Sequence, residues 1–263
     1  MFLPMYEFVI PLLTAHLVAD FLIQSDEDVK NKSSPRVLLK HSLIAGLLSW
    51  ILLGVIQAWY AGLLIFLSHA AIDYLKSKES NSTLKAFLLD QGAHLLVIVL
   101  ISYLLISQAL LPSTNYWVQL FGNAYYSALV VISGAILCVP VGGIIVGFQV
   151  KPFLDQLDKS GENSPEQSGG AARSAKSRGF ENGGKTIGYL ERALIYLFVL
   201  VNQPAGIGFL IAAKSVFRFG ELKESSNRME AEYIIIGTLY SFLYGILISY
   251  AITKLLKLLI YIF

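Results

Sequence analysis

The chain has 263 residues, of which 55% are hydrophobic and 14% charged, with a net charge of +2 and a mean hydropathy of +0.62. Soluble domains carry about a quarter charged residues, so this composition excludes an ordinary soluble protein. The small net charge gives no reason to expect nucleic-acid binding. The single cysteine, Cys138, excludes an internal disulfide and a cysteine-based metal site.

The apolar residues come in runs of about 20, the length that crosses a bilayer as a helix. The fold class that we expect is therefore all-α, a polytopic helical membrane protein. Four runs predict a membrane domain over residues 1–112, at positions 5–24, 38–58, 60–75 and 87–111. The first run lacks the basic start of a cleavable signal peptide and contains His16 and Asp20, so we expect it to be a membrane helix.

The second half of the chain predicts fewer and less regular membrane segments. Residues 113–150 hold a loop and a fifth helix at 125–150. Residues 151–186 are rich in Gly, Ser and charge, which is typical of a disordered linker. The remaining residues, 187–263, predict a short pair of apolar segments, either crossing helices or a re-entrant hairpin, and then a last membrane helix. The expectation is six long membrane helices plus this pair, making seven or eight segments.

The distribution of Lys and Arg predicts the orientation of the chain. Alternate connections, counted with their helix ends, hold 18 of the 20 Lys and Arg residues. We therefore expect these charged loops in the cytoplasm, the N-terminus outside, and a multi-pass protein of a bacterial inner membrane.

Three pairs of histidine and aspartate, each one helical turn apart, lie inside these apolar runs. They are His16 with Asp20, His69 with Asp73, and Asp90 with His94. Imidazole and carboxylate groups are costly in lipid, so such pairs are functional candidates. With the predicted orientation, these pairs and His41 all fall at similar depth toward the cytoplasmic face, on four consecutive helices.

This pattern predicts a metal site, because bundle helices commonly project pairs of ligands one turn apart into the core. Nitrogen and oxygen ligands without thiolate suit a divalent metal, zinc first and manganese, iron or cobalt as alternatives. We expect the ligands His16, Asp20, His69, Asp73 and His41, with His41 ranked last among the candidate residues. Asp90 or His94 would act as a general base, and Gln24, Lys76 and Gln91 would contact substrate.

The leading functional hypothesis is a membrane-embedded, metal-dependent hydrolase that acts on a lipid-like or phosphate-containing substrate. Its partners would be membrane lipid and a small-molecule or lipid substrate, and association into oligomers is compatible with the sequence. A metal-ion or proton-coupled transporter is the first alternative, ranked second because the outer halves of the helices contain few polar residues. A scaffold whose polar residues only hold helices together is the second alternative.

A second polar cluster follows the linker and includes Lys214 and Arg218, one turn apart. One interpretation is a network of structural ion pairs with Glu191 and Glu232. The other is an anion site in which Lys214 and Arg218 bind a phosphate or a lipid headgroup.

Several ordered motifs resemble a family of bacterial membrane proteins known as domain of unknown function 3307. The motifs HLVADFLIQ, SHAAIDYLK and DQGAHLL resemble its N-terminal signature. Three further motifs, GYLERALI, AAKSVFRFGELK and EYIIIGTLYS, resemble the C-terminal half of its longer members. The resemblance covers about residues 1–110 and 186–250. It implies an inner-membrane protein whose signature residues are the same His, Asp and Gln, and it supplies no activity.

Overall fold

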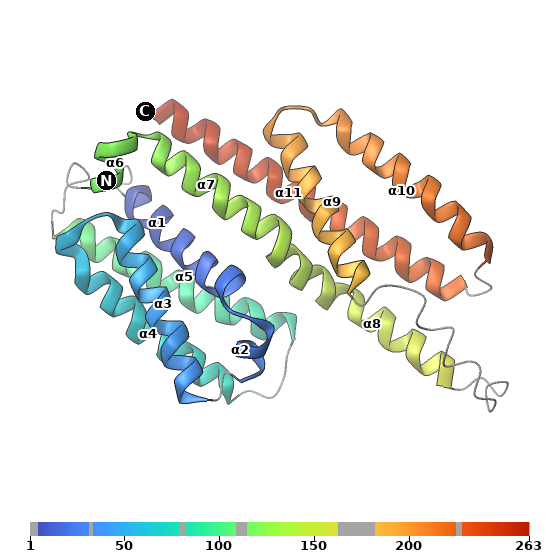
Figure 1. Ribbon diagram of the computed structural model, residues 1–263, viewed down its shortest axis with the longest axis horizontal. Coiled ribbons are helices and arrows are strands. Elements are labelled where there is room, and N and C mark those ends of the chain that lie inside the picture. The colour runs from blue at the N-terminus through green and yellow to red at the C-terminus, as the bar shows by residue number, and fades with distance from the viewer. Residues whose placement is uncertain are drawn as a thin grey trace. The chain divides into compact units, whose positions relative to one another are not determined.

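The protein is described here by a computed structural model that covers residues 5–31, 34–78, 83–108, 115–162, 182–224 and 228–262 (Figure 1). Within these ranges the secondary structure is helical and contains no strand. Six helical stretches are long and apolar enough to cross a membrane: Met5–Ile23, Pro35–Leu53, Ile56–Ser77, Leu84–Ser107, Ala124–Leu157 and Ala231–Leu259. The predicted multi-pass helical fold is confirmed.

The chain divides into two compact units. The N-terminal unit comprises Met1–Ile136 and Lys254–Phe263, and the C-terminal unit comprises Leu137–Thr253. The N-terminal unit is a bundle of four helices in a closed ring, because α1 contacts α3, α3 contacts α4, α4 contacts α5, and α5 contacts α1 (Figure 1). Its helices are α1 (Met5–Val18), which continues as the π-helix η1 (Ala19–Ile23), α3 (Pro35–Leu53), α4 (Trp59–Ser77) and α5 (Leu84–Ser107), with α7 (Ala124–Ile136) against α1.

Three short helices that the hydropathy pattern does not predict connect the long ones. They are α2 (Asp26–Lys30), the 3-10 helix η2 (Ile56–Ala58) and α6 (Tyr116–Phe121). Ser25 and Asp28 form a capping box at the start of α2, in which each side chain accepts a hydrogen bond from the other residue's backbone N–H. These bonds hold the pKa of the Asp28 carboxyl below its usual value. At the start of α6, the side-chain oxygen of Asn115 accepts hydrogen bonds from the backbone N–H groups of Trp117 and Val118.

A pair of glycines brings α3 and α4 into close contact. A Cβ atom added to Gly46 would lie 2.6 Å from the backbone oxygen of Gly62, and one added to Gly62 would lie 2.8 Å from that of Gly46. Both distances are shorter than van der Waals contact, so the helix backbones approach as closely as glycine allows. This contact lies along the same two helices as His41 and His69.

An apolar core fills the half of the bundle formed by the start of α1, the end of α3, the start of α4 and the end of α5. Its buried members include Phe8, Leu12, Leu53, Ala61 and Leu105. The buried hydroxyl group of Ser102 in this half donates a hydrogen bond to a carbonyl of its own helix. The polar site lies at the other end of the same four helices, which we call the polar end.

The C-terminal unit contains the π-helix η4 (Leu137–Val141), α8 (Gly142–Glu162), α9 (Gly183–Leu200), α10 (Ala205–Glu224), and α11 (Arg228–Ile262) as far as Thr253. The expected start of the linker at residue 151 differs from the structure, because α8 continues to Glu162. The middle of the linker, residues 163–181, lies outside the described residues, and its disorder stays a prediction. Both α9 and α10 are longer than the short apolar pair predicted there.

Candidate metal centre

All four histidines of the chain meet at the polar end of the bundle. His16 comes from α1, His41 from α3, His69 from α4 and His94 from α5, and each is at most 5% exposed. The Nε2 atoms of His41 and His69 are 3.0 Å apart. The ring of His94 lies 4.8 Å from that of His16 and 4.3 Å from that of His69, measured between centroids. Four separate helices thus deliver one cluster of imidazoles.

Two carboxylates enter the same cluster. Asp20 Oδ1 lies 3.3 Å from Nε2 of both His41 and His69. Asp73 Oδ2 lies 3.7 Å from Nε2 of His41 and 3.8 Å from that of His69. Asp20 belongs to η1, where the backbone N–H of Gln24 bonds to the carbonyl of Ala19, five residues earlier. Such π-bulges change the direction of side chains and are frequent at functional sites.

These spacings fit the ligand shell of a metal ion. A tetrahedral ion with bonds of about 2.0–2.1 Å keeps its ligand atoms about 3.3–3.4 Å apart. The nitrogen atoms of His41 and His69 and the two carboxylate oxygens give five separations between 3.0 and 3.8 Å. We call Asp20, His41, His69 and Asp73 the inner ligand set. The chemistry of this set, two imidazoles and two carboxylates, suits zinc and its neighbours among the divalent metals.

The remaining two histidines each have one nitrogen fixed as a donor. His16 Nε2 lies 3.1 Å from Gln91 Oε1, and His94 Nδ1 lies 2.9 Å from the backbone oxygen of Asp90. Because both oxygens can only accept, these nitrogens carry the protons, and the lone pairs lie on His16 Nδ1 and His94 Nε2. Neither of those two buried atoms has a hydrogen-bond partner. Buried polar atoms rarely lack partners, so each one calls for an explanation.

A shell of hydrogen bonds surrounds the histidines and involves residues that the sequence suggested for other roles. Asp90 Oδ2 accepts hydrogen bonds from Lys76 Nζ and from Gln91 Nε2. Gln91 thereby presents its oxygen to His16. Lys76 and Gln91, predicted to bind substrate, and Asp90, predicted as a base, thus lie in contact with one another beside the imidazoles. Outer contacts of this kind orient metal-binding histidines.

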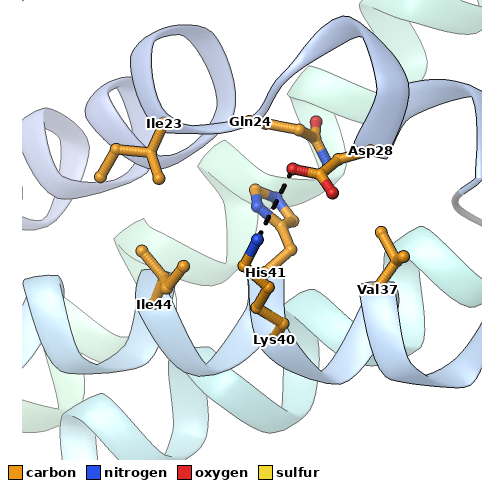
Figure 2. Close-up of a pocket in the computed structure, with 7 residues that line it drawn as sticks. All are labelled: Ile23, Gln24, Asp28, Val37, Lys40, His41 and Ile44. Carbon is orange, nitrogen blue, oxygen red and sulfur yellow. Dashed lines mark ion pairs between the residues drawn. The ribbon is translucent and has the colours of Figure 1, made fainter.

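A small pocket opens onto His41 from the η1–α2 segment and α3. It is lined by Ile23, Gln24, Asp28, Val37, Lys40, His41 and Ile44 (Figure 2). Lys40 Nζ lies 3.9 Å from Asp28 Oδ2 at its edge. Gln24, one of the predicted substrate contacts, lines this pocket. Asp28 and Lys40 were not among the predicted site residues. Ser25 and Asp28 have the spacing of a capping box, and this spacing was the feature of the sequence that could have indicated an ordered backbone beside the pocket.

The other two predicted substrate contacts belong to the C-terminal unit. Lys214 Nζ donates a hydrogen bond of 2.7 Å to Glu191 Oε2. Arg218 lies within α10, but its side chain is outside the described residues. The buried Arg192 donates to Ser241 Oγ at 2.8 Å and to the backbone oxygen of Val139 at 3.1 Å. These contacts favour the interpretation of this cluster as a structural network.

Comparison with known proteins identifies a family for the part of the chain that carries the site. Residues 8–121 match the model of a family described as protein of unknown function, DUF3307. Over these residues the chain is similar to that family. No curated protein and no solved structure matches the chain. All four histidines, with Asp20, Asp73 and Asp90, lie inside the matched range, whereas Lys214 and Arg218 lie outside it.

Proposed function

We propose that the N-terminal unit is the metal centre of a membrane-embedded, metal-dependent hydrolase. A divalent ion, zinc in the first instance, is held by the inner ligand set of Asp20, His41, His69 and Asp73. The observation that carries the proposal is the convergence of two imidazole nitrogens and two carboxylate oxygens, from α3, α4 and the π-helix η1, at the separations of a coordination shell.

The burial of charge supports a cation at this place. Asp20 and Asp73 are carboxylates inside apolar helices, and taking a carboxylate out of water costs several kcal/mol unless a positive charge accompanies it. A divalent cation would balance the negative charges of both carboxylates. The cluster brings imidazole nitrogen and carboxylate oxygen atoms within 3.0–3.8 Å of one another, where a cation can bind several of them at once.

Hydrolysis is the chemistry that such an ion supplies when bound, because it lowers the pKa of water and polarises a carbonyl or phosphoryl oxygen. The chain's own contribution is the pocket at His41, where Gln24 and Lys40 supply an amide and an ammonium group to a polar substrate. We propose that the polar group of a lipid-like or phosphate-containing substrate meets the protein at the mouth of this pocket while its apolar part stays in the membrane.

The distribution of apolar side chains supports an enzyme over a transporter. The pocket reaches the cluster from the polar end, whereas Phe8, Leu12, Leu53 and Leu105 fill the opposite half of the bundle. Access from one side suffices for hydrolysis but not for transport. We place the polar end at the cytoplasmic face of an inner membrane, because the connections at this end carry many of the Lys and Arg residues.

The metal part of the proposal is tested by elemental analysis of the purified full-length protein. We expect bound zinc in the wild type and its loss in His69→Gln and Asp73→Asn. Asp155→Asn in α8 is the matched control, because Asp155 is an exposed carboxylate in the C-terminal unit, and it should keep the wild-type metal content. A wild type that binds no more metal than the two site variants would end the proposal.

The catalytic part is tested in vesicles of mixed phospholipids containing the protein, with the products analysed by mass spectrometry. We expect a headgroup product that forms with zinc, stops with a chelator, and is absent with His69→Gln. Metal binding without any change in lipid or added phosphoesters would retain the metal centre and reject the hydrolase. Passage of zinc into sealed vesicles would favour the transporter instead.

A further inference from the structure

The inner ligand set leaves a question for catalysis, and the inference that follows rests on the proposed function. An ion that holds four protein ligands in a tetrahedron has no open position, which is the arrangement of structural zinc sites. Catalytic sites hold three protein ligands and keep the fourth position for water or substrate. If Asp20, His41, His69 and Asp73 all bind one ion, that ion is closed.

Two further ligand atoms lie beside the inner set and are not used by it. His16 Nδ1 and His94 Nε2 are buried, carry lone pairs and have no hydrogen-bond partner. Their protons are fixed on the opposite ring nitrogens by acceptors that cannot donate, the side-chain oxygen of Gln91 and the backbone oxygen of Asp90. The two rings are stacked, with an angle of 20° between their planes. Each imidazole thus has a buried lone pair that is available to a metal ion.

Asp20 supplies the third ligand. Its Oδ1 atom lies 3.6 Å from His16 Nδ1, which is less than the combined length of two bonds of about 2.0–2.1 Å. An ion can therefore lie between these two atoms. The same carboxylate lies 3.3 Å from the nitrogens of His41 and His69. Asp20 is in position to bridge two ions, and bridged sites hold their ions about 3.5–4 Å apart.

We infer that the bundle holds a second divalent ion through His16, His94 and Asp20, adjacent to the ion of the inner ligand set. Asp20 bridges the pair. The second ion has three protein ligands and keeps an open position for water, as catalytic ions do. The class of site is a two-metal hydrolytic centre, of the kind that acts on phosphoesters. His94 is then a metal ligand and does not serve as the general base.

The experiment counts ions and tests whether they are neighbours. Full-length protein is stripped of metal, loaded with Zn²⁺ and measured by native mass spectrometry, and a second sample is loaded with Mn²⁺ and measured by electron paramagnetic resonance. We expect two Zn²⁺ ions per wild-type chain and the spectrum of an exchange-coupled Mn²⁺ pair. We expect His94→Gln to bind fewer than two ions and to lose the coupled spectrum.

The outcomes separate this inference from the function on which it rests. One ion per wild-type chain, or two without magnetic coupling, overturns the second site and leaves the inner ligand set in place. Two coupled ions in His94→Gln overturn the ligand assignment. No ion in the wild type overturns the proposed function as well. The wild-type spectrum decides the question even if the variant fails to fold.

Discussion

The close contact of α3 and α4 gives the sharpest test of how the bundle builds its site, through the substitution Gly46→Ala. The new Cβ would lie 2.6 Å from the Gly62 backbone oxygen and 2.9 Å from Cβ of Phe66. Restoring a contact of 3.0–3.4 Å requires the two helices to separate by about 0.4–0.8 Å. Metal sites tolerate changes of only about 0.2 Å in ligand distance.

We therefore expect Gly46→Ala to move His41 away from His69 and to weaken zinc binding by about tenfold or more, which is about 1.4 kcal/mol. Overpacking of this kind also costs about 1–3 kcal/mol of stability. The measurements are a competitive zinc titration of the purified protein and its thermal unfolding without metal.

The matched control is Gly92→Ala in α5, the helix that carries His94. A Cβ atom added to Gly92 has no neighbour within 4 Å, so this variant should bind zinc as the wild type does. If Gly46→Ala binds zinc with wild-type affinity, the glycine contact does not set the ligand spacing and this argument is wrong.

Three further predictions concern the surroundings of the centre. Gln91→Leu removes the acceptor that orients His16, and we expect zinc affinity to fall by about 10–100-fold in a competitive titration. Zinc binding should weaken as the pH falls from 7.5 to about 5.5, because imidazole and carboxylate must be deprotonated to bind metal and protons therefore compete with the ion; isothermal titration at several pH values measures this. Lys214→Ala leaves Glu191 without its bonded lysine and should lower thermal stability while metal content stays unchanged.

The sequence predicted the membrane class and the residues that gather, because both depend on local patterns. Runs of apolar residues mark membrane helices, and a spacing of four residues places His16 with Asp20 and His69 with Asp73. These side chains do lie together in the bundle. Their roles as ligands stay predictions.

The importance of His41 was harder to predict, because it has no carboxylate one turn away. Its place 3.0 Å from His69 depends on the approach of α3 and α4 at Gly46 and Gly62, which is a tertiary contact. The same limit applies to Gln91, whose bond to His16 joins residues 75 positions apart.

The ends of helices were predicted less well than their centres. The hydrophilic composition of residues 151–186 suggested that the fifth membrane helix ends at residue 150, yet α8 continues to Glu162. Leu154 and Leu157 maintain an apolar stripe through this stretch, and hydropathy averaged over a window does not detect such a stripe.

If the proposed ion is bound, the apolar half of the bundle, which contains Phe8, Leu12, Leu53 and Leu105, would leave it accessible to solutes from the polar end alone. A chelator that cannot permeate lipid would strip only those molecules whose pocket faces it, and the rest would be protected until the vesicles are opened with detergent. The orientation of the chain in its native membrane could therefore be determined from the metal itself, without a tag or an antibody.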